Sequence, residues 1–291
     1  MASNFPHFSW NPWLDVSLMF QYGFMRNAFL AGTALSIVSG LVGYFVLLRR
    51  QAFAGEALSD VAFTGAMGGA VLGIYPLAGV IALTVLGAMA MGSFSQRIGE
   101  RDVAVGTVLA WVLGLGVLFL SLFNSGGNPG GFSGVTALFG SILSISTSQV
   151  WVIVAIASGI GLTLLIVARP LLFASLDADV ASARGVPVRA LGLVFMLLLA
   201  LTVAEAVQAV GALLVFALLL LPAAIAQRLT PRPYTGLGLA ILLAVLATLL
   251  GLTIAFYSGL PSSVCITLLV FCGYVVATGW PRHAGRRLPY E

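Results

Sequence analysis

Long uncharged runs dominate the chain, and short polar stretches separate them. Twenty-two uncharged residues lie between Arg26 and Arg49, and 49 lie between Arg232 and Arg282. A helix that crosses a membrane needs about 20 apolar residues. When the runs are cut at clusters of Gly, Pro, Asn and Ser, they predict nine spans, at residues 27–48, 54–74, 77–95, 103–123, 148–168, 190–206, 209–227, 235–256 and 263–280.

Two further segments do not fit the pattern of full spans. Residues 135–147 are apolar but too short to cross a bilayer, which predicts a half-helix or re-entrant piece. The first 26 residues mix aromatic with polar side chains, which is typical of an amphipathic segment at the outer membrane interface. We therefore expect an interfacial segment at 1–26, a transmembrane domain at 27–280 and a cytosolic tail at 281–291.

The composition places the chain among helical membrane proteins. Hydrophobic residues make up 60% of the chain and charged residues 8%, whereas soluble domains carry about 25% charged residues. The apolar runs are continuous, which excludes the alternating strands of a membrane barrel. The predicted fold class is therefore an all-α polytopic membrane protein with eight or nine transmembrane helices. Disordered, collagen-like, secreted disulfide-rich and nucleic-acid-binding classes are excluded.

The arginines indicate the orientation of the chain. There is no lysine, and all 13 basic residues are arginines. If the first span ends in the cytosol, only Arg26 falls outside. The other twelve then lie on the cytosolic side: Arg49, Arg50, Arg97, Arg101, Arg169, Arg184, Arg189, Arg228, Arg232, Arg282, Arg286 and Arg287. The positive-inside rule predicts an external N-terminus and a cytosolic C-terminus, and the alternation favours an odd number of spans.

Two acidic residues are candidate ligands for a transported cation. Glu56 and Asp60 are spaced i, i+4, so both carboxylates project from one helix face. Asp60 lies about 15 Å from the inner boundary at 1.5 Å per residue, where ionisable residues usually serve a function. Ligands that are all oxygen favour hard cations such as Mn²⁺, Mg²⁺ or Ca²⁺. In the alternative interpretation, Glu56 lies at the inner water boundary and Asp60 caps or hydrogen-bonds a neighbouring helix.

A third acidic residue, Glu205, lies in the sixth predicted span, and Gln208 follows just after the span. Counting from the inner face places Glu205 about 24 Å higher, near the outer surface. Two interpretations remain open. Glu205 is either a simple charge at a helix end, or part of an outer mouth that receives the substrate or contacts a protein that delivers it.

The polar segment between the fifth and sixth spans predicts a short inner helix. Asp177 and Ala181 begin the pattern, Arg184 follows, and Gly185 and Pro187 end it. A short helix on the cytosolic side, between two spans, is a candidate docking element for a cytosolic partner.

Several motifs along essentially the whole chain are similar to those of one family. They are Arg49-Arg50 followed by Gly55-Glu56-Ala-Leu-Ser59-Asp60, then Leu138–Leu143, Asp177–Pro187, Val210–Val215 and Leu220–Ala226. Together they resemble the membrane permeases of zinc, manganese and iron ABC importers. The resemblance implies a homodimer in the bacterial inner membrane, a pair of cytosolic ATP-binding subunits and an external metal-binding protein.

The resemblance also assigns roles to residues. It implies that the coupling loop at 170–189, with Asp177, Ala181, Arg184, Gly185 and Pro187, contacts the ATPase, which alone hydrolyses ATP. It implies that Glu56 and Asp60 line the metal path, where the family has Asp and His. The loss of the imidazole favours manganese, then iron or zinc, as the transported ion. No permanently bound cofactor is expected.

Two other functions remain open at this point. One is an ABC permease of related fold for an organic or chelate substrate, such as a siderophore, haem or cobalamin. The other is a proton-coupled secondary carrier that works through Glu56, Asp60 and Glu205 without an ATPase.

Overall fold

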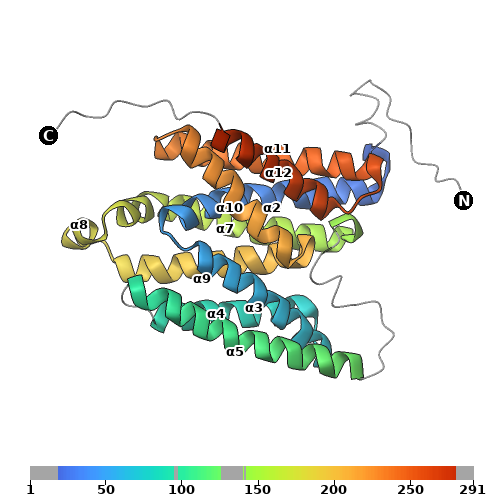
Figure 1. Cartoon of the computed structure of the whole chain (residues 1–291), viewed down its shortest axis with the longest axis horizontal. Coiled ribbons are helices and arrows are strands. Elements are labelled where there is room, and N and C mark those ends of the chain that lie inside the picture. The colour runs from blue at the N-terminus through green and yellow to red at the C-terminus, as the bar shows by residue number, and fades with distance from the viewer. Residues whose placement is uncertain (1–18, 95–97, 126–139, 141, 280–291) are drawn as a thin grey trace, which may run out of the picture.

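The computed structural model describes residues 19–94, 98–125, 140 and 142–279. Within these residues the regular elements are all helical (Figure 1). The long helices are α2 (Gly23–Leu48), α3 (Ala52–Val71), α4 (Pro76–Phe94), α5 (Ile98–Ser125), α7 (Thr147–Leu176), α9 (Val188–Val210), α10 (Ala212–Leu229), α11 (Pro233–Ser258) and α12 (Ser262–Gly279). The short ones are the 3-10 turn η1 (Ile142–Ser144) and α8 (Ala178–Ala183).

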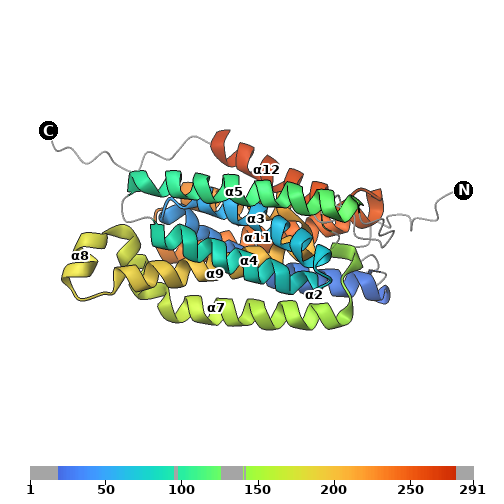
Figure 2. The same cartoon turned by 90° about the horizontal axis from the view of Figure 1, so that it is seen from below.

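The long helices lie roughly parallel to one axis and run alternately in opposite directions (Figures 1 and 2). Helix α8 projects beyond one end of this bundle, which we call the α8 end. Each of the nine predicted spans coincides with one long helix. Among the described residues, six helices are long and apolar enough to cross a membrane, and α4 and α10 contain shorter apolar stretches. The chain is therefore an all-α polytopic membrane protein.

Helix boundaries differ from the prediction where local capping decides them. Helix α7 begins after Ser146, whose hydroxyl accepts from the Gln149 backbone N–H in a capping box, and continues through Pro170 to Leu176. Arg169 therefore lies within a helix, not in a loop. Helix α9 extends to Val210 and ends at Gly211, whose φ of +91° only glycine adopts readily.

Two predicted segments fall largely outside the described residues. Of the expected half-helix at 135–147, the structure describes Gly140, the turn η1 and the first residue of α7. Of the interfacial segment at 1–26, it describes residues 19–26, and α2 already begins at Gly23. The tail at 281–291 lies entirely outside the described residues.

Helix α3 packs closely against its neighbours through small residues. A Cβ atom on Gly65 would lie 3.0 Å from the Val80 Cα of α4, and one on Gly68 would lie 3.0 Å from the Phe119 ring of α5. The small residues of α3 thus let its backbone approach α4 closely and the Phe119 side chain of α5 pack against it. These contacts hold one side of α3 and leave the opposite side open, which positions the carboxylates described next.

Candidate metal path and coupling segment

The α3 carboxylate pair, Glu56 and Asp60, lies on the open side of α3. Glu56 is exposed and Asp60 is partly exposed, in one stripe with Phe53 and Phe63. The two carboxylates are close enough for their charges to repel each other. The structure therefore places both predicted ligands on one face, and that face belongs to the surface of the single chain.

Few groups around the α3 carboxylate pair could neutralise its negative charge. Among the described residues, neither carboxylate takes part in an ion pair. Nor do the described residues bring three His, Cys, Asp or Glu side chains together in a group that could hold a metal. The hydroxyl of Thr64 donates to the backbone oxygen of Asp60 at 3.1 Å, which leaves the carboxylate itself available. The α3 carboxylate pair thus offers a cation two carboxylates and, among the described residues, no third acidic, His or Cys ligand.

Glu205 does not lie at a solvent-exposed helix end, as one of the two predicted interpretations required. It is 3% exposed, five residues before the end of α9. The position is buried because α7 and the beginning of α4 pack over this face of α9, a tertiary contact that residue counting along one helix does not reveal.

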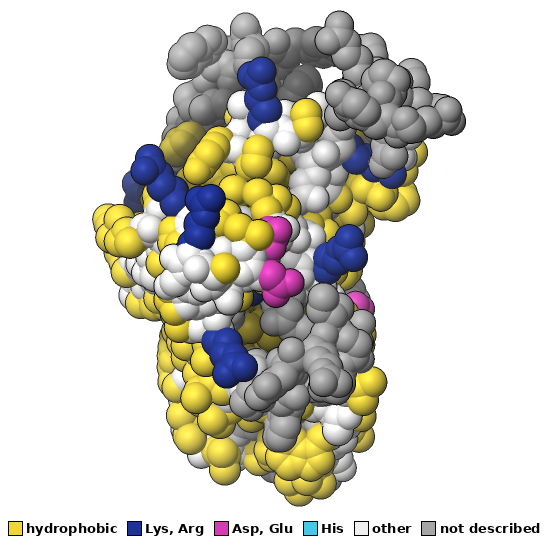
Figure 3. Space-filling model, turned by 90° about the vertical axis from the view of Figure 1, so that its left-hand side faces the viewer, with side chains coloured by type: hydrophobic (Ala, Val, Ile, Leu, Met, Phe, Trp, Pro, Cys, Tyr) yellow, Lys and Arg dark blue, Asp and Glu magenta, His cyan; other side chains and the backbone are white. Residues whose placement is uncertain are grey.

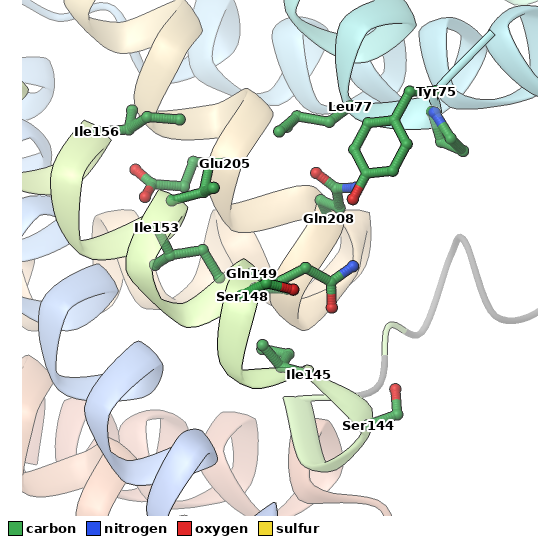
Figure 4. Close-up of a pocket in the computed structure, with 13 residues that line it drawn as sticks. Tyr75, Leu77, Ser144, Ile145, Ser148, Gln149, Ile153, Ile156, Glu205 and Gln208 are labelled. Carbon is green, nitrogen blue, oxygen red and sulfur yellow. The ribbon is translucent and has the colours of Figure 1, made fainter.

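Glu205 and Gln208 line a cavity of about 920 Å³, which we call the α7–α9 cavity (Figure 4). Its other polar lining residues are Tyr75, Ser144, Ser148 and Gln149. Since α8 connects the end of α7 to the beginning of α9, the first turns of α7 and the last turns of α9 lie at the opposite end of the bundle. The contributions of Tyr75, Ser144, Ser148 and Gln149 were not predicted from the sequence; the Ser-x-x-Gln capping box at 146–149 was the available signal for Gln149.

The predicted short inner helix is present as α8. Asp177 caps it, because its carboxylate accepts from the Val180 backbone N–H at 3.0 Å. At the other end, the N–H groups of Gly185 and Val186 donate to the carbonyls of Ser182 and Ala181, both at 3.0 Å. This pair of bonds is the Schellman motif, and it requires the left-handed backbone of Gly185, at φ +81°.

The coupling segment, Asp177–Pro187, is anchored by two of its residues and otherwise exposed. Ala181 is fully buried, and the Arg184 guanidinium lies 5.8 Å from the centre of the Phe173 ring of α7. Pro187 leads directly into α9. Figure 3 shows that acidic and arginine side chains are scattered over this end of the molecule. The segment is thus a preformed, charged projection.

The predicted site residues therefore form three separate groups. The α3 carboxylate pair lies on an open helix face, the coupling segment lies at the α8 end, and Glu205 with Gln208 lines a cavity near the opposite end. None of the six polar cavity residues belongs to the other two groups.

Known proteins are similar to this chain over most of its length. A family model described as the ABC 3 transport family matches residues 21–279. The manganese transport system membrane protein MntC of Halalkalibacterium halodurans is 30% identical over 261 residues, which cover 89% of this chain and 88% of that protein. The high-affinity zinc uptake system membrane protein ZnuB of Haemophilus influenzae is also 30% identical, over 79% of this chain and 87% of that protein.

A solved structure has the same fold over nearly the whole chain. PsaBC from Streptococcus pneumoniae, in complex with a Fab, superposes with a TM-score of 0.78 at 26% identity, over 91% of this chain and 94% of that one. Family membership removes the stand-alone secondary carrier from consideration, because ATP hydrolysis in an ABC importer belongs to a separate chain. The chain therefore belongs to the ABC 3 transport family, as a multi-pass membrane permease subunit of a bacterial ABC importer.

Proposed function

We propose that this permease imports manganese as its preferred ion, and that the α3 carboxylate pair lines the path of the ion. The observation that carries the proposal is the position of Glu56 and Asp60 on the open face of a helix that is otherwise closely packed. Relatives named for manganese and for zinc support a divalent metal over an organic chelate.

The chemistry of the pair favours manganese over zinc. Both side chains offer only oxygen, and carboxylate oxygen suits hard cations such as Mn²⁺, whereas Zn²⁺ in proteins is usually held with imidazole or thiolate. Two carboxylates that repel each other also gain from a divalent cation, which relieves the repulsion. The same two residues would also bind ferrous iron, but with a weaker preference than for Mn²⁺.

The open face of α3 also supports a homodimer. A carboxylate exposed to the hydrocarbon core of a membrane costs a few kcal/mol. If the α3 faces of two copies meet around a shared axis, four carboxylates surround one aqueous path and none faces lipid. The exposed Phe53 beside them would pack against the second copy.

The coupling segment would dock on an ATP-binding subunit, one for each protomer. Its capped, rigid backbone and exposed charges suit a helix that transmits force across an interface. Arg49 supports the same end of the bundle, because its guanidinium donates to Ser175 of α7 at 3.3 Å and lies over the Phe195 ring of α9. The α8 end is then cytosolic, the opposite end faces outward, and an external metal-binding protein delivers the ion there.

Uptake by the reconstituted complex tests the proposal. The permease and its ATP-binding subunit are placed in liposomes, and ATP-dependent accumulation of Mn²⁺ is measured with Glu56→Gln, Asp60→Asn and the double variant. We expect uptake to fall at least about tenfold in each single variant and to be lost in the double variant, because the neutral amides keep shape but not charge.

Thr107→Val provides the control, since it removes an exposed polar side chain from the neighbouring helix α5 without changing charge. It should transport like the wild type. Wild-type uptake by the double variant, with the ATP-binding subunit still co-purifying, would remove the α3 carboxylate pair from the path.

A further inference from the structure

The α7–α9 cavity contains a carboxylate that the proposed path does not use. Helix α9 contributes Glu205 and Gln208, which are spaced i, i+3 and so share one face. In Figure 4, Gln208, Gln149, Ser148 and Tyr75 gather in one part of the cavity, while Glu205 lies deeper, between Ile153 and Ile156 of α7. The cavity thus has a polar mouth and a single acidic group at its apolar inner part.

Glu205 is buried without a hydrogen-bond partner. It is 3% exposed, and among the described residues neither of its carboxylate oxygens makes a hydrogen bond. The backbone of Ala157 in α7 lies close enough to interact with the charge, but it is part of a continuous helix. An ionised carboxylate in such surroundings is costly unless a cation compensates it, and acidic residues at membrane depth generally mark ion pathways.

The donor atoms around the cavity suit a hard cation that keeps much of its water. Glu205 offers a carboxylate and Gln208 an amide oxygen, but the amide oxygen of Gln149 already accepts from the Ser146 backbone N–H at 3.0 Å. One carboxylate is too little for full coordination, so waters must supply the rest, and the Gln208 amide can hold one of these waters. A volume of about 920 Å³ leaves ample room for them, because one water occupies about 30 Å³ in the liquid.

The C-terminal end of α9 adds an electrostatic field that favours a bound cation. The cavity lies against the last two turns of this helix, whose C-terminal end carries a partial negative charge. The Val207 carbonyl is satisfied by the Gly211 N–H at 2.9 Å, and α9 stops there. A cation that enters from this end therefore meets the helix terminus first and Glu205 behind it.

We propose that the α7–α9 cavity binds one partly hydrated divalent cation within each protomer, with Glu205 as its charged ligand and with Gln208, nearer the mouth, accepting a hydrogen bond from one of the ion's bound waters. The identity of the ion as the imported metal rests on the proposed function; the site itself shares no residue with the α3 carboxylate pair. The ion would occupy it at the end opposite α8, before it reaches the path between the two copies.

Binding of Mn²⁺ to the purified complex, measured by equilibrium dialysis, tests this proposal. The background is the double variant Glu56→Gln, Asp60→Asn, which removes the α3 carboxylate pair. In this background we expect one Mn²⁺ per permease chain to remain. Adding Glu205→Gln should then weaken its affinity about tenfold or more, and Gln208→Leu about threefold.

Two further variants separate loss of a ligand from loss of the fold. Glu205→Asp keeps the charge and should bind Mn²⁺ within about threefold of the parent. Thr163→Val removes an exposed polar side chain of α7 outside the cavity and should leave binding unchanged. The melting temperature of each variant is measured in parallel, and Glu205→Gln should not melt lower, because no hydrogen bond is lost.

The possible outcomes are distinct. Unchanged Mn²⁺ affinity on adding Glu205→Gln overturns the cavity site, whatever uptake shows for Glu56 and Asp60. Binding that depends on Glu205, together with normal uptake by the Glu56→Gln, Asp60→Asn double variant, keeps the cavity site and overturns the proposed path. Displacement of the Mn²⁺ by an equal concentration of Na⁺ would contradict a site for divalent ions.

Discussion

The α3 carboxylate pair and Glu205 show two opposite ways in which a membrane helix presents an acidic residue. Glu56 and Asp60 stand on the open face of α3, whereas Glu205 is 3% exposed and faces a partly open cavity lined by residues of the same chain. In the proposed homodimer the first group is completed by a second chain, whereas the second group is lined by one chain alone. We propose that exposure in the single chain distinguishes a site between copies from a site inside one.

Replacing each acidic residue by lysine should give the largest difference between Glu205 and Asp60. Glu205→Lys would bury an ammonium group with no partner, which typically costs about 3 kcal/mol or more. We expect the purified complex to melt well below the wild type or to fail to assemble. Asp60→Lys occupies a partly exposed position, so it should assemble and melt near the wild-type temperature while uptake is lost.

Melting curves and size-exclusion profiles of both variants measure this difference. Equal destabilisation by the two lysines would mean that Asp60 is as enclosed as Glu205. The comparison between an open and an enclosed acid would then be wrong.

Substitution at Gly65 tests what holds the open face in place. Gly65→Ala puts a Cβ 3.0 Å from the Val80 Cα of α4, and closer still to the Gly79 carbonyl, so α3 must shift. Overpacking of this kind typically costs about 1–3 kcal/mol. We expect a lower melting temperature and reduced uptake. Gly114→Ala in α5, where no atom lies within 4 Å of the new Cβ, is the control and should be neutral or slightly stabilising.

Substitution at Gly185 should have a smaller effect, confined to the coupling segment. A Cβ meets nothing within 4 Å there, but φ is +81°, which costs an L-residue about 1–2 kcal/mol. We expect Gly185→Ala to lower the ATPase stimulation by the permease severalfold while Mn²⁺ binding is unchanged. Gly185→Asn should be milder, because asparagine tolerates the left-handed region better. Normal stimulation with Gly185→Arg would argue against docking at this segment.

Local patterns predicted part of this structure well. The positions of the nine long helices follow from the length of apolar runs, and α8 follows from Asp177 and Gly185, because both depend on neighbouring residues only. The spacing of Glu56 and Asp60 likewise sufficed to place them on one face.

Features that depend on packing between distant segments were not predictable. The burial of Glu205 results from α7 and the beginning of α4 covering α9, and no count of residues along α9 indicates that. Helix α7 passes Arg169 and Pro170 because the helix is supported on both sides of the proline, whereas charge and proline together suggested an end. The open side of α3 is visible only once its glycine side is known to face α4 and α5.

In the proposed path the imported ion passes between carboxylates of two copies. A structure of the Mn²⁺-loaded complex, with anomalous scattering recorded at the manganese edge, tests this path most directly. We expect a peak within about 2.5 Å of a carboxylate oxygen of Glu56 or Asp60 from both protomers. An α3 face turned toward lipid, with manganese bound elsewhere in the occluded complex, would contradict it.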